Sequence, residues 1–450
     1  MSELKELDRK YLWHPFTQMK EWMEDEPLVI ERGEGNYLID TDGRRYLDGV
    51  SSLWCNIHGH RKREIDDAIR KQLDKIAHST MLGLANCPSI RLGERLVSIS
   101  PHGLEKVFYS DSGSTSVEIA LKMAFQYWQQ KRKEKTESRN RFVYFTSSYH
   151  GDTIGSVSVG GIDLFHRLYS PLLFNSYKAY YPHCYRCPVD KDYPSCKITC
   201  IKQLNGILDR YHNNIAALII EPLVQGAAGI ITSPPGFLRK VRDLCTDYNI
   251  LMIADEVATG FGRTGRMFAC EHEEVSPDIL CLAKGITGGY LPLAATLTTE
   301  EVFGAFLGEY RECKTLFHGH TYTGNPLACA AAIANLEVFE KGNILKILAP
   351  KITLFEGLLD RFKILPHVGE VRQKGFMAGI ELVMDKGNKE PYPLEDKIGI
   401  KVCKEARRDG LIIRPLGNTI VLMPPLSIRD SELKDMTDIV HKAIVKITNE

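Results

Sequence analysis

The chain has 450 residues, of which 44% are hydrophobic and 25% are charged, and its 57 basic and 57 acidic side chains give a formal net charge of zero. This length exceeds what one hydrophobic core usually supports, so we expect a globular protein with two or three domains, or with one large and one smaller domain. The balanced charge gives no reason to expect nucleic acid or an anionic membrane as a partner, which leaves small molecules and other subunits.

The N-terminal segment carries no targeting signal that we can identify. Residues 1–6 are polar and charged, and no segment approaches the roughly 20 apolar residues that a membrane-spanning helix needs. We therefore expect a soluble, cytoplasmic protein. Residues 37–43 have the pattern of a hairpin-like turn, but the first fifty residues are too few for a core of their own and should pack on another domain.

Short apolar runs alternate with helical patterns between residues 105 and 300. This alternation predicts a doubly wound α/β domain with a mostly parallel sheet. Helical spacing at 117–130 and 237–248 supplies crossovers that parallel strands need. The strand-like runs are 107–109, 142–145, 217–220, 250–254, 279–282 and 293–297.

The first candidate site is the polar stretch 110–116, which contains Gly113 and Ser114 and precedes the helix predicted near Val117. Backbone amides and hydroxyls at a helix N-terminus suit a phosphate dianion. The alternative is a capping box that pairs a serine with Glu118. Both can hold, because a cap and a phosphate use the same unpaired amides.

Tyr149 opens the segment Tyr149-His150-Gly151-Asp152, which follows another predicted strand. Its side chain should therefore point into the same crevice, where an aromatic ring can stack on a flat ligand. A tyrosine packed in the core is the alternative. The two His-Gly-His triplets, at 58–60 and 318–320, pair imidazoles two residues apart, but further metal ligands are not evident.

The chain contains twelve cysteines, several of them inside apolar runs, where a free thiol behaves as a small buried hydrophobe. Four others cluster in a proline-rich stretch with one C-x-x-C pair and one looser pair. They are Cys184, Cys187, Cys196 and Cys200. Zinc or an iron–sulfur centre is one interpretation, and a loop of free thiols is the other. The metal therefore stays unknown at this stage.

Two apolar runs lead into groups that suggest a pyridoxal phosphate site. Run 250–254 ends at Asp255, and Lys284 follows run 279–282. Ligands of open α/β sheets bind beyond the carboxyl ends of the strands, where the pattern places both groups. A partly desolvated amine can form a Schiff base with a carbonyl, and an aspartate can keep a pyridine nitrogen protonated. A solvated surface lysine, or an aspartate that caps a helix or binds magnesium, is the alternative.

The glycines at 260, 262 and 265 match the dinucleotide pattern G-x-G-x-x-G. The stretch lacks the lysine and hydroxyl of a nucleotide-binding P-loop. A dinucleotide fold also needs a full helix before the next strand, yet the segment before residue 279 is short and contains Pro277. A nicotinamide site is therefore disfavoured.

The C-terminal part has its own pattern. A helical pattern covers 327–339, and strand-like runs follow at 377–382, 411–414 and 420–423, which predicts a smaller α+β domain. Arg414 lies between an apolar run and Pro415, a position that suggests a buried guanidinium. Such a group could bind a substrate carboxylate through two parallel hydrogen bonds. Pairing with an internal acid is the competing interpretation.

Over essentially its whole length the chain resembles class III pyridoxal-phosphate aminotransferases, on the segments 253–265, 279–285 and 319–326. The resemblance implies a fold-type-I transferase with a mostly parallel seven-stranded sheet and a homodimer with shared active sites. The domains would be an N-terminal segment (1–55) that packs with the small domain, a large cofactor-binding domain (56–330) and a small C-terminal domain (331–450).

The resemblance also implies roles for individual residues. Lys284 would bind pyridoxal 5'-phosphate covalently and then move a proton, Asp255 would keep the pyridinium charged, and Tyr149 would cover the ring and touch substrate. The phosphate would be held by Gly113 and Ser114, with His320 and Thr321 contributed by the neighbouring subunit.

Four more stretches, 12–19, 51–54, 111–114 and 414–417, resemble the enzymes of biotin biosynthesis that convert 8-amino-7-oxononanoate into 7,8-diaminononanoate with S-adenosylmethionine as amino donor. Arg414 would then bind the acceptor's carboxylate. The other substrate contacts would be Phe16, Leu53, Trp54 and Gly319.

Three positions depart from the pattern of the adenosylmethionine-dependent enzymes, which have tyrosine at Phe16, tryptophan at Leu53 and tyrosine at Val421. A subgroup that uses lysine as donor looks closer, so lysine is the alternative donor. An ω-aminotransferase acting on 4-aminobutyrate, ornithine or β-alanine is a second alternative. A metal-binding or interaction protein on a retired enzyme scaffold is the rival from another class.

Overall fold

The computed structural model describes residues 3–131 and 138–449. Its largest sheet has the strand order β4-β12-β11-β10-β7-β5-β6, and its neighbouring strands are parallel except where β12 pairs with β4 and β11. The predicted fold class, α/β with a mostly parallel seven-stranded sheet, is confirmed. The strands are β4 (Leu104–Ser110), β5 (Arg141–Phe145), β6 (Tyr177–Ala179), β7 (Ile215–Ile220), β10 (Leu251–Asp255), β11 (Ile279–Leu282) and β12 (Ala294–Thr299).

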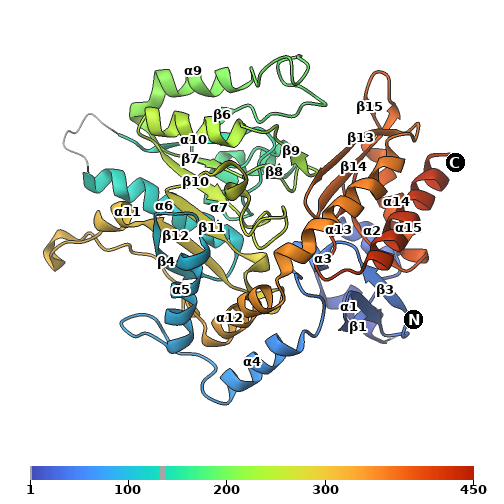
Figure 1. Ribbon diagram of the computed structural model, residues 1–450, viewed down its shortest axis with the longest axis horizontal. Coiled ribbons are helices and arrows are strands. Elements are labelled where there is room, and N and C mark those ends of the chain that lie inside the picture. Colours follow the sequence, from blue (N-terminus) through green and yellow to red (C-terminus); the bar gives the residue numbers. More distant parts are fainter. Residues whose placement is uncertain (1–2, 132–137, 450) are drawn as a thin grey trace.

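Both faces of this sheet are buried, which explains why its strands are continuous apolar runs. Successive residues point to opposite faces: Ile253 and Ile279 belong to one core, whereas Ala254 and Leu280 belong to the other. Helix α6 covers the first face, and α9 and α10 cover the second (Figure 1). These helices are α6 (Gly113–Lys131), α9 (Ile201–Tyr211) and α10 (Phe237–Asp247).

Two smaller sheets bring the two ends of the chain together. One is antiparallel and contains β13, β14, β15, β17 and β18, and in the other β16 pairs in parallel with β3. The N-terminal strands accordingly lie beside the C-terminal helices (Figure 1). The bounds are β1 (Ile30–Glu34), β2 (Tyr37–Asp40), β3 (Arg45–Asp48), β13 (Val368–Lys374), β14 (Met377–Asp385), β15 (Glu390–Pro391), β16 (Leu411–Ile412), β17 (Arg414–Leu416) and β18 (Thr419–Leu422).

The apolar run 411–414 was predicted as one strand, and this prediction is wrong. Its first two residues form β16, which pairs with β3, whereas Arg414 begins β17, which pairs with β18. The chain therefore changes sheets at Ile413. Pro415 has no backbone N–H to donate to a neighbouring strand, so the strand that contains it pairs less readily on that side.

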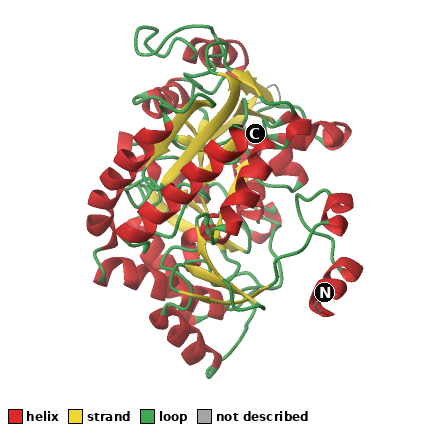
Figure 2. Cartoon of the chain, turned by 90° about the vertical axis from the view of Figure 1, so that its right-hand side faces the viewer, coloured by secondary structure: helices red, strands yellow, loops and turns green. Residues whose placement is uncertain are grey.

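Most of the remaining helices pack around the sheets, whereas the two short helices nearest the N-terminus have no buried residue and project to one side (Figure 2). The helix predicted at 327–339 is present as α12, which packs on α4 and α5. In the part of the chain that the structure describes, no helix combines the length and the apolar character needed to cross a membrane. The helices are α1 (Glu3–Tyr11), α2 (Met19–Glu24), α4 (Arg63–Leu73), α5 (Cys87–Ile99), α12 (Pro326–Lys341), α13 (Ile344–Leu359), α14 (Ile398–Arg408) and α15 (Asp430–Thr448).

Candidate active site

A cavity of about 720 Å³ lies at the carboxyl ends of β4, β5, β10 and β11. Parallel strands end at the same edge of a sheet, so residues that follow different strands meet there. The cavity brings together seven of the residues discussed above. They are Trp54, Gly113, Ser114, Tyr149, His150, Asp255 and Lys284.

Lys284 stands two residues beyond the end of β11 and faces this cavity. Its Nζ lies 5.0 Å from the centre of the Trp54 ring. Burial lowers the pKa of Lys284 below its usual value, and the carboxylates of Asp255 and Glu221 oppose this shift in part. Lys284 is therefore not the solvated surface lysine of the alternative interpretation, and its amine is easier to deprotonate than an ordinary lysine.

Asp255 is the last residue of β10 and is buried. Its Oδ2 lies 2.7 Å from Nδ1 of His150, and its Oδ1 accepts a hydrogen bond from the backbone N–H of Val257 at 3.0 Å. A turn rather than a helix follows Asp255, so it does not cap a helix. The pairing with a buried imidazole holds a negative charge at a fixed position on the cavity wall.

The polar stretch at 110–116 runs from the end of β4 at Ser110 into the first turn of α6, which begins at Gly113 rather than near Val117. Gly113 and Ser114 therefore contribute backbone amides of the kind that have no partner within a helix. The predicted serine cap is present, but its partner is Thr115 and not Glu118. Ser112 Oγ accepts the Thr115 N–H at 3.3 Å and Thr115 Oγ1 accepts the Ser112 N–H at 3.1 Å, whereas Glu118 accepts the backbone N–H of Gly155 at 2.7 Å. The Thr115 and Ser116 amides are thus bound to Ser112, which leaves the amides of Gly113 and Ser114 for an anion.

The polypeptide around this helix start is packed too tightly for larger residues. A Cβ atom at Gly113 would lie 2.6 Å from Cγ1 of Val257, and one at Gly151 would lie 2.4 Å from Cβ of Ser114. Ser114 Oγ also lies 2.9 Å from Thr153 Oγ1 and accepts a hydrogen bond from the Thr153 N–H at 3.0 Å. Together with the buried carboxylate and amine, this cradle fits a phosphorylated pyridine aldehyde.

Tyr149 is half-buried at the cavity wall, so it is not the core tyrosine of the alternative interpretation. Its hydroxyl donates to Asp152 Oδ2 at 2.8 Å. Its ring lies 6.2 Å from that of Phe165, which in turn lies 5.4 Å from the ring of Phe16. Phe16 does not line the cavity, but this aromatic row connects it to the cavity wall.

A left-handed turn presents Leu53 and Trp54. Residues Ser51 to Trp54 have φ values of 52°, 46°, 70° and 71°, a conformation that costs about 1–2 kcal/mol per residue. Asp48 offsets this cost by accepting hydrogen bonds from the Ser52 N–H and hydroxyl at 2.9 and 2.8 Å. The turn buries Trp54 against the cavity and leaves Leu53 48% exposed.

Glu221 also lines the cavity, and the sequence analysis missed it. It directly follows β7, as Asp255 ends β10, so the same rule about strand ends could have found it. Its two oxygens accept the backbone N–H groups of Tyr149 at 3.0 Å and of Gly226 at 2.9 Å. Burial raises the pKa of Glu221 to about 7, and nearby His150 opposes the shift.

Glu221 should make stability depend on pH. Its pKa of about 7 in the folded chain lies above the ordinary value of 4.5, so the stability it contributes is complete below pH 4.5 and is lost as the pH rises through 7. Between about pH 5 and pH 8, the cofactor-free wild type should lose about 3 kcal/mol more than Glu221→Gln. Urea unfolding of both proteins at the two pH values measures the difference, and parallel losses would contradict it.

Six predicted site residues do not line this cavity: Phe16, Leu53, Gly319, His320, Thr321 and Arg414. Gly319 and Thr321 are exposed. Arg414 is half-buried in β17, and no acidic side chain among residues 3–131 and 138–449 pairs with it. The internal ion pair that competed with a carboxylate-binding role is therefore not formed.

The two His-Gly-His triplets have other partners. Burial lowers the pKa of His58 to about 4, and His60 Nε2 lies 3.1 Å from Asp48 Oδ2. His318 Nδ1 lies 3.1 Å from Lys122 Nζ. Within the described residues, neither triplet belongs to a cluster that could hold a metal ion.

The glycine pattern at 260–265 lies in consecutive turns, and only a short 3-10 helix, Ala269–Glu273, stands between it and β11. The full helix of a dinucleotide-binding motif is not formed there. Arg263, between the glycines, is buried and donates to the carbonyl oxygens of Pro424 at 2.7 Å and Asn56 at 2.9 Å. This stretch therefore has a structural role.

Comparison with known proteins adds independent evidence. A family model described as aminotransferase class-III matches residues 19–444. The adenosylmethionine-8-amino-7-oxononanoate aminotransferase of Nitratidesulfovibrio vulgaris is 56% identical over 447 residues, which cover 99% of this chain and 82% of that protein.

Two solved structures are also similar. The enzyme of the same name from Methanocaldococcus jannaschii superposes with a TM-score of 0.94 at 49% identity and covers 98% of both chains. An amine transaminase from an uncultivated Pseudomonas species, in its PLP-bound form, gives a TM-score of 0.91 at 39% identity, covering 97% of this chain and 98% of that one.

Proposed function

Because this chain belongs to the class-III aminotransferases, we propose that it transfers an amino group to 8-amino-7-oxononanoate and forms 7,8-diaminononanoate, a step of biotin biosynthesis. The observation that carries the proposal is the convergence of a half-buried lysine and a histidine-paired aspartate on one cavity, in a chain related over its full length to enzymes named for this acceptor. S-adenosylmethionine, which those names include, is the proposed donor.

Pyridoxal 5'-phosphate is the cofactor of this enzyme class, and when bound it supplies an electron sink for charge that develops on the substrate carbon. We assign its covalent attachment to Lys284 and its ring nitrogen to Asp255. The phosphate is assigned to Gly113 and Ser114 at the start of α6, where backbone amides and the helix dipole favour an anion. Tyr149 is placed to cover the ring.

Lys284 is also the proposed acid and base. Burial lowers its pKa, so more of the amine is neutral and able to accept a proton from the substrate carbon. The protonated amine can then donate that proton to another atom. Trp54, whose ring lies 5.0 Å from Nζ, shields the amine from water on one side. Asp255 keeps its negative charge close to the cofactor nitrogen through its contact with His150.

The acceptor carries a carboxylate on an apolar chain, and the protein offers a candidate binding group for the carboxylate and another for the chain. Arg414 offers a half-buried guanidinium with no acidic partner among the described residues, which can bind a carboxylate with two hydrogen bonds. Leu53, Trp54 and Phe16 offer apolar surface near the cavity. We therefore assign the substrate contacts to these four residues.

We further propose a cytoplasmic homodimer in which each chain completes the other's site. Tyr310, Phe317 and Tyr322 are 99%, 74% and 63% exposed, and large exposed aromatic residues on one segment favour an interface. In a two-fold symmetric dimer, the same segment of each chain contacts the other chain. Gly319 of the partner subunit would then contact substrate, and His320 of the partner subunit and Thr321 of the partner subunit would contact the phosphate.

The donor is tested by measuring 7,8-diaminononanoate formed from 8-amino-7-oxononanoate with S-adenosylmethionine or with lysine. We expect the true donor to give a kcat/KM at least about tenfold higher than the other. Lysine is the alternative because of the departures at Phe16, Leu53 and Val421. A dominant rate with lysine would reassign the donor. No product with either, together with turnover of 4-aminobutyrate, ornithine or β-alanine, would contradict the proposed acceptor.

A further inference from the structure

The four cysteines of the segment between β6 and α9 line one small cavity that shares no lining residue with the active site. Cys184 and Cys187 lie in one turn of this segment, and Cys196 and Cys200 lie just before α9. All four line a partly open space of about 10 Å³, together with His183 and Lys191. That volume suits a single water molecule or ion.

The four thiols line the same small space. Cys184 and Cys187 come from one turn, and Cys196 and Cys200 come from the segment that leads into α9. A cation bound there would favour the deprotonated form of its ligands and hold them together as thiolates.

The spacing also suits a tetrahedral ion. C-x-x-C and C-x-x-x-C are both pair spacings of structural zinc sites. In the described residues no three of these sulfurs lie within 4.8 Å of one another, so the ion must draw them together. Rotation about a cysteine χ1 moves Sγ by ~3 Å between staggered positions, so side-chain rotation alone can change these separations.

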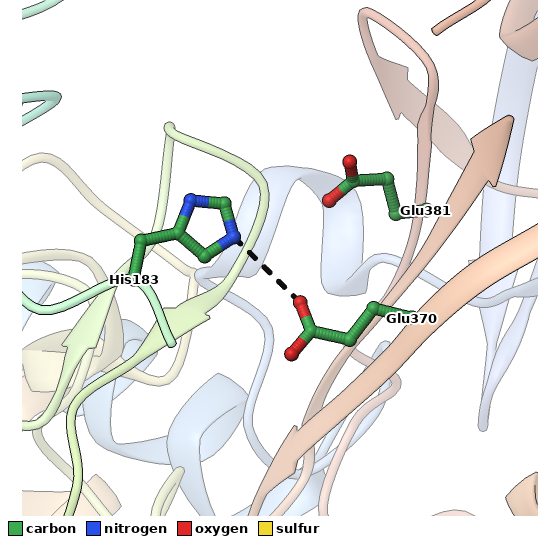
Figure 3. Close-up of side chains that lie close together, drawn as sticks. All are labelled: His183, Glu370 and Glu381. Carbon is green, nitrogen blue, oxygen red and sulfur yellow. Dashed lines mark ion pairs between the residues drawn. The ribbon is translucent and has the colours of Figure 1, made fainter. Parts of the chain in front are cut away.

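A second group of possible ligands, His183, Glu370 and Glu381, lies within 4.8 Å of one another (Figure 3). These carboxylates already have cationic partners. Arg372 Nη1 lies 2.6 Å from Glu370 Oε2 and 2.5 Å from Glu381 Oε2, and Arg186 Nε lies 2.7 Å from Glu381 Oε1. Two guanidinium groups balance two carboxylates, so this group does not need a metal ion.

These ion pairs instead connect the cysteine segment to the sheet that contains β13 and β14. Arg186 lies between Cys184 and Cys187 in sequence and reaches Glu381 on β14. His183 Nε2, next to Cys184, lies 3.6 Å from Glu370 Oε2 on β13. A ligand that holds the two turns of the cysteine segment together would therefore also stabilise the contacts of this segment with β13 and β14.

We propose that Cys184, Cys187, Cys196 and Cys200 bind one Zn²⁺ ion as a structural site. Four thiols bind the ion as thiolates and release four protons, with no change of oxidation state. The single-ion size of the cavity favours zinc over an iron–sulfur cluster, which places several atoms among its ligands. The bound ion closes the segment and holds it against the small sheet. This inference does not depend on the amino donor or acceptor.

The test is metal analysis of the purified, cofactor-loaded protein, kept reduced throughout. We expect about one zinc per chain for the wild type and less than about 0.1 for the double variant Cys184→Ser/Cys187→Ser. The control is Cys87→Ser/Cys313→Ser, which removes two exposed thiols outside the segment and should keep its zinc. Zinc retained by the first variant would overturn the assignment of the ligands.

A second measurement uses the wild type alone, so a variant that fails to fold does not prevent a decision. Removal of zinc with a chelator should expose about four additional thiols to a thiol reagent and lower the melting temperature. Replacement by Co²⁺ should give the strong visible bands of tetrahedral thiolate coordination. A wild type that contains no zinc, that holds iron and sulfide instead, or that pairs these cysteines in disulfides under the same conditions would overturn the proposal.

Discussion

Lys284→Ala is expected to lower the rate of amino transfer by about four orders of magnitude, because it removes both the covalent attachment of the cofactor and the group that moves the proton. The absorption band of the lysine-bound cofactor should disappear as well. The variant should still fold, because the side chain faces a cavity rather than a packed core. Stopped-flow measurement of each half-reaction, with spectra of the loaded protein, gives both quantities.

The control for this experiment is Lys351→Ala. Burial also lowers the pKa of Lys351, but this lysine donates to the carbonyl oxygen of Ile428 and lies outside the cavity. Its loss should change stability and leave the spectrum unaltered. A small primary amine added to Lys284→Ala should restore part of the rate, since it can replace the missing base. Undiminished turnover by Lys284→Ala would refute the assigned role.

Asp255→Asn is expected to lower kcat by about 10²–10⁴-fold with a smaller change in KM. Asparagine has nearly the same size and can still accept the hydrogen bond from the Val257 N–H, but it carries no negative charge. The cofactor nitrogen would then lose its proton, and charge on the substrate carbon would be stabilised less. The half-reaction with the donor alone measures this loss before the second substrate enters.

The neighbouring acid supplies the control for Asp255. Glu256 is fully buried, accepts hydrogen bonds from Thr259, Ala269 and Cys270, and does not line the cavity. Glu256→Gln should therefore change stability rather than kcat. If both substitutions reduced kcat equally, the effect of Asp255 would come from general disruption of this strand end and not from its charge at the cofactor.

The family and the centre of the site were predictable because they depend on local patterns. Continuous apolar runs identify strands that are buried on both faces, and the ends of parallel strands meet at one edge of the sheet. Asp255 and Lys284 follow two such runs, so their proximity follows from the order of strands alone. The full-length class III resemblance was confirmed by the family model and by relatives above half identity.

Other features depend on contacts between distant residues, and no local pattern records them. His150 meets Asp255 across 105 positions, and Glu221 holds the backbone of Tyr149 across 72. The left-handed turn at residues 51–54 has no glycine, so its sequence gives no sign of positive φ; distant groups such as the Met423 carbonyl hold it.

The sequence by itself determined the strand runs, the class of enzyme and the two residues at the strand ends, because each is set by neighbours along the chain. Only the tertiary structure decided that run 411–414 divides between two sheets, that Glu118 binds Gly155 instead of capping α6, and that four cysteines share one small cavity. These outcomes follow from which distant groups compete for the same hydrogen bonds and the same space, and that competition is resolved only when the chain is folded.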